Sequence, residues 1–167
     1  MNYTQQVQQH NYSLEYVPEH LKTIELCELA VQQQGLMLCF VPDSFKTKEV
    51  CELAVQQDGY AISFVPEHLI TAELCMIAVQ KNGWEIEYVL EQNRTLELCE
   101  IAVNRYGRAL RYVPEKFKTT EFCLMAVKQN GLALQYVPEE LKTYELCETA
   151  TIRNNCAYNY VPERFKI

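Results

Sequence analysis

The phrase ELCELAVQQQG at residues 25–35 returns five more times, each copy 24 residues further along the chain. The later copies read EVCELAVQQDG at 49–59, ELCMIAVQKNG at 73–83, ELCEIAVNRYG at 97–107, EFCLMAVKQNG at 121–131 and ELCETATIRNN at 145–155. Self-similarity at a fixed period of this size is the sequence signature of a solenoid, in which each repeat buries its apolar face by stacking on its neighbours. The period therefore indicates the fold class before any residue is considered alone.

The same period predicts one repeat domain that spans residues 1–167. Its six full repeats, called repeats 1 to 6 below, are 17–40, 41–64, 65–88, 89–112, 113–136 and 137–160. Partial repeats precede and follow them at 1–16 and 161–167. Repeat 4 departs from the pattern: Leu90 stands where the other repeats have Pro, and Asn93 fills a Leu or Phe slot that we expect to be core.

Each repeat is predicted to contain one main helix. In repeat 6, Thr143 stands where an N-cap belongs, and Glu145 follows where a carboxylate favours the positive end of the helix dipole. About eleven helix-forming residues then lead to a Gly or Asn, which we expect to end the helix in the left-handed conformation. A broad apolar arc on the helical wheel suits a helix that contacts a repeat on each side. In repeat 1 this arc comprises Leu26, Cys27, Leu29, Ala30 and Val31.

The second half of each repeat allows two interpretations. Leu134, Val137 and Leu141 have helical spacing, but Pro138 disfavours helical geometry at Val137, so we expect a short helix, a break at Val-Pro and one further turn. The alternative takes segments such as AISFV at 61–65 as strands, which gives an α/β solenoid of the leucine-rich kind. That architecture carries its regular Asn or Cys on the strand side, whereas the regular Cys here lies on the predicted helix. We therefore favour an all-α solenoid of helical-hairpin repeats.

One cysteine recurs on the main helix of every repeat, and we call this set the cysteine ladder. Its members are Cys27, Cys51, Cys75, Cys99, Cys123 and Cys147. Stacked helices lie about 8–10 Å apart, whereas a disulfide needs Cα atoms within about 7 Å. The chain also lacks the C-x-x-C spacing that usually announces zinc. We predict buried, reduced packing residues, with Cys39 and Cys156 as unpaired thiols outside the ladder.

A glutamate also recurs at the start of each main helix, forming the set Glu25, Glu49, Glu73, Glu97, Glu121 and Glu145. Calcium needs six to eight oxygens, usually from one flexible loop, whereas these carboxylates come one per repeat. We interpret them as favourable charges at helix N-termini. A basic residue three places earlier is expected to offset their mutual repulsion, namely Lys22, Lys46, Arg94, Lys118 and Lys142.

The segment AVKQNGLALQYVPEEL at 126–141 combines a helix, Asn-Gly, Ala-Leu-x-Tyr and x-x-Glu-x-Leu. In this the chain resembles the tandem repeats called domain of unknown function 4116, common in proteins of amoeba-associated intracellular bacteria and giant viruses. The resemblance covers essentially the whole chain. It implies a helical repeat fold and a role at a microbe–host interface, and it supplies no catalytic residues. The chain departs from that family in placing Val-Pro and Cys at fixed positions.

Composition excludes several classes of function. The formal net charge of -7 disfavours nucleic acid as a partner, and we find no basic patch in the sequence. No apolar run approaches the ~20 residues that span a bilayer, and the polar start MNYTQQVQQHNY lacks a signal-peptide core. No nucleophile, base and orienting group can be assembled from three histidines and isolated glycines, so we expect no enzyme, no cofactor and no metal. We predict a cytoplasmic protein, in the host-cell cytosol if it is a secreted effector.

Two irregular slots remain as candidates for a binding face. On the outer stripe of the main helix, Met76 and Leu124 replace a glutamate that the other four repeats use, and Leu96 lies between them. The slot after the glycine holds aromatic residues in repeats 2 and 3, which suit either a binding hot spot or the core. The candidate binding residues are Met76, Leu96, Leu124, Tyr144, Tyr60 and Trp84.

The leading hypothesis is a non-enzymatic protein–protein interaction scaffold, because solenoids bind partners through such continuous faces. The alternative is a structural spacer or a self-assembling filament, since the terminal VPERFKI offers no obvious polar cap. The expected partner is a protein, and the chain itself is expected to be a monomer or to associate weakly end to end.

Overall fold

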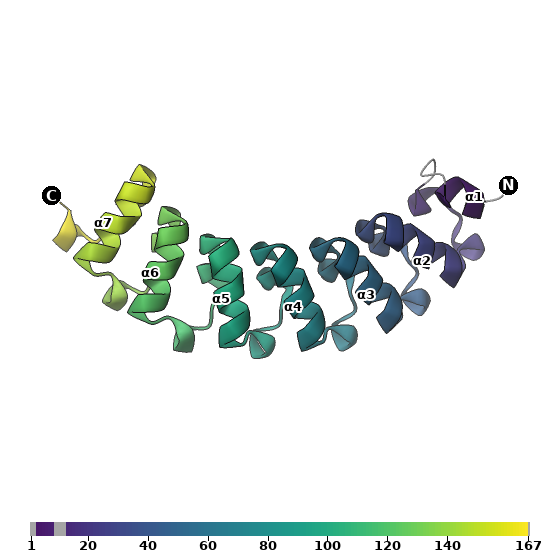
Figure 1. Cartoon of the computed structure of the whole chain (residues 1–167), viewed down its shortest axis with the longest axis horizontal. Coiled ribbons are helices and arrows are strands. Elements are labelled where there is room, and N and C mark those ends of the chain that lie inside the picture. The colour runs from purple at the N-terminus through teal and green to yellow at the C-terminus, as the bar shows by residue number, and fades with distance from the viewer. Residues whose placement is uncertain (1–2, 9–12, 167) are drawn as a thin grey trace. The chain divides into compact units, whose positions relative to one another are not determined.

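A computed structural model of the chain describes residues 3–8 and 13–166. Every element within these ranges is helical, which confirms the all-α repeat solenoid (Figure 1). The strand alternative at 61–65 is wrong, because Gly59–Phe64 forms a 3-10 helix. The α-helices are α1 (Tyr3–Gln8), α2 (Ile24–Gln33), α3 (Lys48–Gln57), α4 (Ala72–Lys81), α5 (Leu96–Arg105), α6 (Thr120–Gln129) and α7 (Tyr144–Arg153).

The second half of each repeat is a pair of 3-10 helices separated by the Val-Pro break, as the proline position predicted. Six-residue 3-10 helices follow the α-helices: η3 (Gly35–Phe40), η5 (Gly59–Phe64), η7 (Gly83–Tyr88), η9 (Gly107–Tyr112), η11 (Gly131–Tyr136) and η13 (Asn155–Tyr160). Three-residue turns follow the break: η2 (Glu19–Leu21), η4 (Asp43–Phe45), η6 (Glu67–Leu69), η8 (Glu91–Asn93), η10 (Glu115–Phe117), η12 (Glu139–Leu141) and η14 (Glu163–Phe165), with η1 (Leu14–Tyr16) near the N-terminus.

Each main helix begins at its predicted threonine. The Thr23 hydroxyl accepts a hydrogen bond from the backbone N–H of Leu26 at 3.3 Å, which satisfies one of the free donors of the first turn. The same bond is made by Thr47, Thr71, Thr95, Thr119 and Thr143. The carboxylate of Glu25 accepts from its own backbone N–H and from Thr23, which lowers the pKa of Glu25. These bonds support a capping role for the glutamate ladder.

The five glycines do not adopt the left-handed conformation that we predicted, since none has a φ in that region. The residue before each glycine ends the α-helix in extended geometry, as at Gln34 with φ −145°. The glycine then opens the six-residue 3-10 helix and lies against a backbone carbonyl of the next repeat. A Cβ at Gly59 would lie 2.9 Å from the carbonyl oxygen of Ala78, and a Cβ at Gly107 would lie 2.5 Å from that of Ala126. Glycine is therefore required for close approach between repeats.

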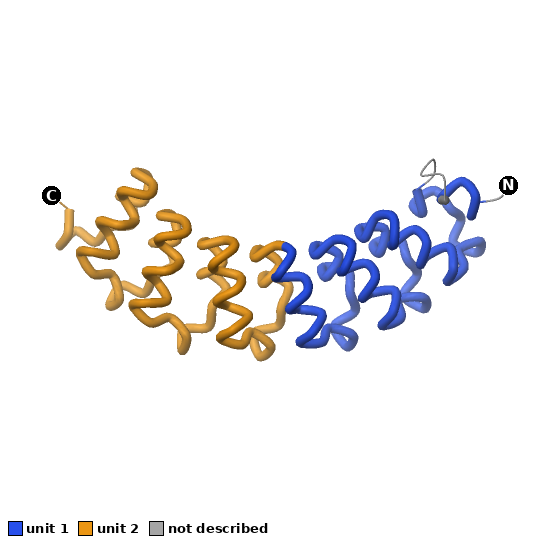
Figure 2. The backbone as a smooth tube through the Cα atoms, in the orientation of Figure 1, with its two compact units in different colours: residues 1–81 blue, residues 82–167 orange. Residues whose placement is uncertain are grey.

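The chain divides into two compact units, Met1–Lys81 and Asn82–Ile167 (Figure 2). In the first unit α2 packs on α3, α3 packs on α4, and η3 packs on η5. In the second unit α5 to α7 pack in sequence, and so do η7, η9, η11 and η13. Each unit thus consists of a row of α-helices against a row of 3-10 helices.

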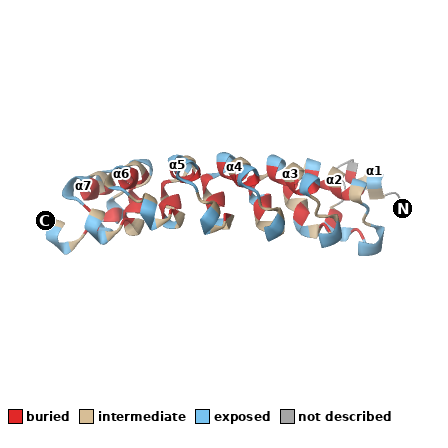
Figure 3. Cartoon of the chain, turned by 90° about the horizontal axis from the view of Figure 1, so that it is seen from below, coloured by how far each residue is buried: buried red, intermediate tan, exposed pale blue. Residues whose placement is uncertain are grey.

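Both rows contribute to the core (Figure 3). The fourth residue of each six-residue 3-10 helix from η3 to η11 is at most 1% exposed. These residues are Leu38, Ile62, Ile86, Leu110 and Leu134. Removing one such side chain from water stabilises the fold by about 1.5–3 kcal/mol, so stacking supplies what a single repeat lacks.

The cysteine ladder belongs to this core, as predicted. All six ladder thiols are at most 3% exposed, and every cysteine in the described residues is a free thiol. Burial raises the pKa of Cys27, Cys51, Cys99 and Cys123 to about 11. By contrast, Cys39 and Cys156 are exposed.

None of the described ion pairs joins the basic residue before a main helix to the glutamate ladder, and repeat 3 has Ile70 in this slot. Lys22 instead binds Glu19 at 3.2 Å, and its Nζ donates to the carbonyl oxygen of Phe40 at 2.7 Å. Arg94 and Lys142 likewise donate to the carbonyl oxygens of the residues 18 places later. The basic side chain therefore ties the start of a repeat to the end of its own 3-10 helix.

Repeat 4 keeps the common backbone despite its two departures. Leu90 has φ −57° and ψ 141°, close to the −55° and 142° of Pro42. The slot of Asn93 is not core, because Asn93 is half-buried and its counterpart Leu21 is 43% exposed. A polar residue is therefore tolerated there. Among the described residues, no helix is long and apolar enough to cross a membrane.

Candidate binding surfaces

In the second unit, apolar side chains lie on the outward-facing side of each of the three helices α5, α6 and α7. We define this surface, the α-stripe, by Leu96, Leu124, Tyr144 and Ile152. Leu96 is 44% exposed, Tyr144 is 50% exposed and Ile152 is 79% exposed. Helical periodicity explains their orientation, because they lie on the face of each helix opposite buried residues such as Leu98 and Ala102.

Leu124 lies at a cleft of about 500 Å³ between α5 and α6. The lining residues are Asn104, Glu121, Leu124, Met125, Lys128 and Gln129. Leu124 and Met125 are half-buried and form the apolar part of the cleft, whereas the other side chains place amides and both signs of charge around it. An apolar centre with a polar rim is the usual composition of a protein-binding surface.

Tyr144 lines a second cleft, of about 260 Å³, between repeat 6 and the partial repeat that follows it. Its ring meets the ring of Phe165 edge to face, with 6.3 Å between centroids. Tyr158 and Thr151 also line this cleft. Two of the predicted binding residues, Leu124 and Tyr144, thus lie beside hollows of the second unit.

The corresponding stripe of the first unit is more polar. Met76, on α4, is half-buried, and its counterparts on α2 and α3 are Glu28 and Glu52. Glu52 pairs with Lys48 at 3.5 Å, which leaves that helix face charged. Met76 therefore has no large exposed apolar neighbour on the stripes of α2 and α3, and its predicted binding role has weaker support than that of Leu124.

The slot after the glycine holds an aromatic residue in each unit. Tyr60 is 41% exposed and contacts Phe64 edge to face at 5.9 Å. Trp84 is half-buried, and its ring meets Tyr106 at 5.0 Å and Tyr112 at 5.7 Å between centroids. Sequence alone left hot spot and core open for both residues, and the structure exposes Tyr60 and leaves Trp84 half-buried.

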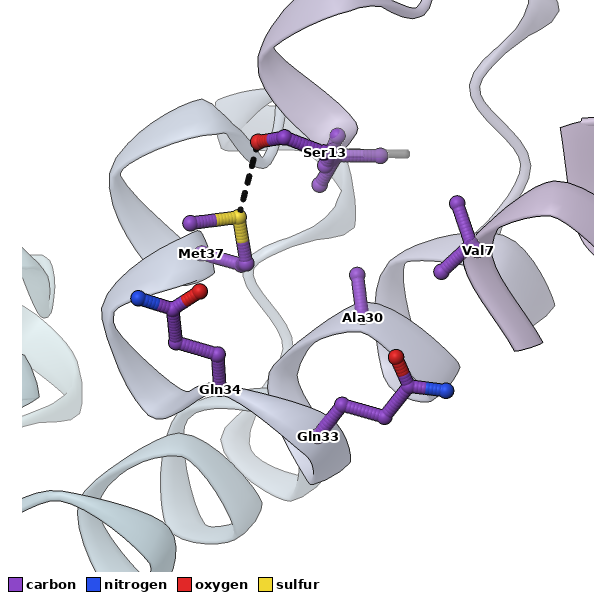
Figure 4. A pocket seen from close by; sticks show the side chains of 7 residues that line it. Val7, Ser13, Ala30, Gln33, Gln34 and Met37 are labelled. Atoms are coloured by element: carbon purple, nitrogen blue, oxygen red, sulfur yellow. Dashed lines mark hydrogen bonds between the residues drawn. The ribbon is translucent and has the colours of Figure 1, made fainter. Parts of the chain in front are cut away.

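A cavity of about 290 Å³ lies near the N-terminus of the first unit (Figure 4). The hydroxyl of Ser13 donates to the sulfur of Met37 at 3.3 Å, and Val7, Ala30 and two glutamines complete the labelled lining. None of these side chains titrates near neutral pH. Residues 9–12, which follow α1 in the sequence, lie outside the described residues, so we assign no role to this cavity.

No group of three or more His, Cys, Asp or Glu side chains suited to hold a metal ion occurs among the residues that the structure describes. His20 and His68 occupy exposed positions on their turns. The glutamates of the ladder lie at separate helix starts. The pKa values of Glu49 and Glu121 are lowered first by a hydrogen bond from the residue's own backbone N–H and then by the hydroxyl of Thr47 or Thr119.

Two features of the second unit were missed from the sequence. Ile152 occupies a slot that is Gln, Asn or Lys in every other repeat, and this departure could have identified it. The clustering of the two η9 arginines was also missed because net charge was considered over the whole chain. Arg108 and Arg111 lie among tyrosines from two neighbouring repeats.

Comparison with known proteins agrees with the repeat architecture. The family model described as Domain of unknown function (DUF4116) matches residues 23–70, 47–94, 71–118, 95–142 and 119–166. Successive matches advance by 24 residues, which is the period seen in the sequence and in the helices. No curated protein and no solved structure matches the chain. Together the matches cover residues 23–166, and the chain belongs to the DUF4116 family of tandem helical repeats.

Proposed function

We propose that the chain is a non-enzymatic scaffold that binds a protein partner through the α-stripe of its second unit. The observation that carries this proposal is the exposure of Leu96, Tyr144 and Ile152 on neighbouring helices that also hold the cleft at Leu124. Exposed apolar side chains gathered on one face mark interaction sites. The half-buried Leu124 and Met125 supply a hollow that an apolar side chain of the partner can fill.

The partner segment best suited to this surface is an amphipathic helix. Apolar groups on neighbouring helices about 8–10 Å apart match side chains that lie about two turns, roughly 11 Å, apart on a partner helix. Glu100, Glu121 and Lys128 border the apolar groups, so the rim can pair with charges of either sign. A role at a microbe–host interface remains a proposal that rests on the family resemblance alone.

Self-assembly by end-to-end stacking has less support. Asn155 occupies the slot that holds glycine in repeats 1 to 5, and it is exposed. A second copy stacked in the repeat register would bring a backbone carbonyl against the Cβ of Asn155, at the place where Gly131 accommodates the carbonyl of Ala150. This clash argues for a binding scaffold over a filament.

The test uses substitutions that other repeats already contain at the same slots. Leu96→Thr, Leu124→Glu and Tyr144→Thr copy Thr120, Glu100 and Thr120, so the triple variant should fold. Ile24→Thr in the first unit makes the matched control change. Captured partners are identified by mass spectrometry from the native lysate.

We expect the triple variant to lose the captured protein and the control to retain it. Leu96 and Tyr144 are exposed, and exposed substitutions usually change the free energy of unfolding by less than about 0.5 kcal/mol each. At the half-buried Leu124, glutamate is the residue that four other repeats carry, so circular-dichroism melting should be nearly unchanged. Unfolding of the triple variant would mean that these side chains are core residues. Normal folding with unchanged capture would place the binding surface elsewhere.

A further inference from the structure

The row of 3-10 helices in the second unit carries a cluster of aromatic and cationic side chains, distinct from the α-stripe. We define this cluster, the η9 cluster, by Trp84, Tyr106, Arg108, Tyr112, Arg111 and Tyr136. Trp84 comes from η7, Arg108, Arg111 and Tyr112 from η9, and Tyr136 from η11, while Tyr106 precedes η9. Adjacent packing of η7, η9 and η11 brings them together.

The geometry holds Arg108 in place. Its Nη2 donates to the hydroxyl of Tyr136 at 3.4 Å. Its Nε is buried and has no hydrogen-bond partner among the described residues. The two Nη groups therefore hold the donors that remain for a ligand, and two such donors can bind one carboxylate.

The aromatic rings next to Arg108 and Arg111 are already ordered. Trp84 meets Tyr106 and Tyr112 edge to face. The guanidinium carbons of Arg94 and Arg111 both lie 5.7 Å from the centroid of the Tyr112 ring. Arginines stacked against fixed aromatic rings lose less conformational freedom on binding than free surface side chains do.

The arginines give the η9 cluster positive charge, whereas the chain as a whole is negatively charged. Four of the six arginines lie in repeat 4, although the chain has a formal net charge of -7. Among the six-residue 3-10 helices, η9 is the one with basic side chains, and it has no acidic residue. The acidic residues of the adjacent η7 are engaged: Glu85 accepts from the Asn82 amide at 2.8 Å, and Glu87 bonds Tyr112.

We infer that the η9 cluster binds a short acidic segment of a partner protein, with side-chain carboxylates on Arg108 and Arg111. A nucleic acid fits less well, because its affinity depends on many phosphate contacts and the rest of the chain is acidic. The rings also already use edge-to-face contacts with one another, which leaves little room for stacked bases. This surface is independent of the α-stripe, so either proposal can fail without the other.

Trp84 makes the test direct, because it is the one tryptophan of the chain and lies in the cluster. The probe is a hexaglutamate peptide, titrated into the full chain while tryptophan fluorescence is recorded. We expect a saturable change that weakens as NaCl is added. Hexalysine should give no such change, and a six-nucleotide oligothymidylate should bind more weakly than hexaglutamate.

Two variants are chosen to keep the fold. Arg108→Leu copies Leu36 and Leu132 from the same slot, and Arg111→Gln copies Gln135. Each should raise the dissociation constant about tenfold, equivalent to the loss of one charge-assisted hydrogen bond of about 1.4 kcal/mol. Lys116→Gln removes the same charge on η10, copies Gln92, and should leave the dissociation constant within about twofold.

Three results would overturn the inference. The first is the absence of a saturable fluorescence change for the wild-type chain at millimolar hexaglutamate. The second is equal weakening by Lys116→Gln, which would indicate non-specific attraction. The third is tighter binding of oligothymidylate than of hexaglutamate. If Arg108→Leu loses helicity in circular dichroism, Arg111→Gln alone decides the outcome.

Discussion

Repeats 5 and 6 align residue for residue, but a neighbour of the same kind covers repeat 5 and no described repeat covers repeat 6. Gly131 is buried, whereas Asn155 in the same slot is exposed. Leu134 is 0% exposed and its counterpart Tyr158 is 43% exposed. The difference indicates that residue choice in each slot follows the neighbouring repeat more than local helix rules.

The same comparison applies to polarity along the α-helices. Val127 of α6 is fully buried, and its counterpart on α7 is the half-buried Thr151. The Thr151 hydroxyl donates to the carbonyl oxygen of Glu148 at 2.9 Å, so it is satisfied without a neighbouring repeat.

The largest expected difference between covered and uncovered positions is in thiol reactivity. Cys123 is buried and its pKa is raised to about 11 by burial, whereas Cys156 is exposed. Labelling of Cys123 requires local opening, which at about 4 kcal/mol slows the reaction roughly a thousandfold. Reaction with a bulky maleimide, followed by peptide mass spectrometry, should label Cys39 and Cys156 first. Comparable rates for ladder and exposed thiols would break the comparison.

The raised thiol pKa values also predict a direction for stability against pH. The folded chain holds protons on Cys27, Cys51, Cys99 and Cys123 up to pH 11, whereas unfolded thiols lose them near pH 9. Stability from this source is therefore complete below pH 9 and is lost as pH rises from 9 to 11. Urea unfolding should show a shallower loss over this range for Cys99→Ala than for the wild-type chain.

The second largest effect is expected at the glycine slot. Gly131→Asn places a Cβ against the carbonyl of Ala150, and overpacking of this kind should cost about 3 kcal/mol. The reverse change, Asn155→Gly, should cost less than about 1 kcal/mol, because the position is exposed and only backbone freedom changes. Urea unfolding measures both. Equal losses for the two variants would mean that the slot is governed by local backbone preference.

These slots also explain which parts of the fold could be predicted from the sequence. The period, the Thr23-type caps, the break at Val-Pro and the burial of the cysteine ladder depend on local pattern, and all were predicted correctly. The role of Gly131 was misassigned, because its constraint is a carbonyl 19 residues away in the next repeat. The contacts of Lys22 with Glu19 and with the Phe40 carbonyl were not predicted, because the carbonyl lies 18 residues later in the chain.

The η9 cluster needed packing information as well. Trp84 and Tyr112 are 28 residues apart, and so are Arg108 and Tyr136, which is one repeat plus about one 3-10 turn. This spacing has meaning only once η7, η9 and η11 are known to pack side by side. For the α-stripe, the wheel correctly placed Leu96 and Tyr144 at the surface, whereas neighbouring side chains leave Leu124 half-buried.

A smaller effect on stability is expected at the basic residue that donates to the carbonyl at the end of its own 3-10 helix. The side chain of Lys142 is 6% exposed and its Nζ donates to the Tyr160 carbonyl at 3.1 Å. Lys166 is 26% exposed and pairs with Glu163. Lys142→Ala should cost about 1.5 kcal/mol, because a charge-assisted bond and a buried stem are lost. Lys166→Ala should cost less than about 0.5 kcal/mol, and thermal melts of the two variants test whether coverage by a following 3-10 helix sets the difference.

The smallest effect on stability is expected at Leu90, where repeat 4 differs from the other repeats in lacking a proline. Leu90 already has the φ of a proline, and Val89 before it has φ −83° and ψ 126°, which a following proline tolerates. Leu90→Pro therefore removes freedom from the unfolded chain without straining the folded one, and should stabilise the protein by about 0.4–1 kcal/mol. Pro114→Leu in repeat 5 should lose a similar amount. The two variants are compared by the midpoint of urea unfolding at constant slope. Destabilisation by Leu90→Pro would mean that the side chain or the N–H of Leu90 makes a stabilising contact that proline cannot make.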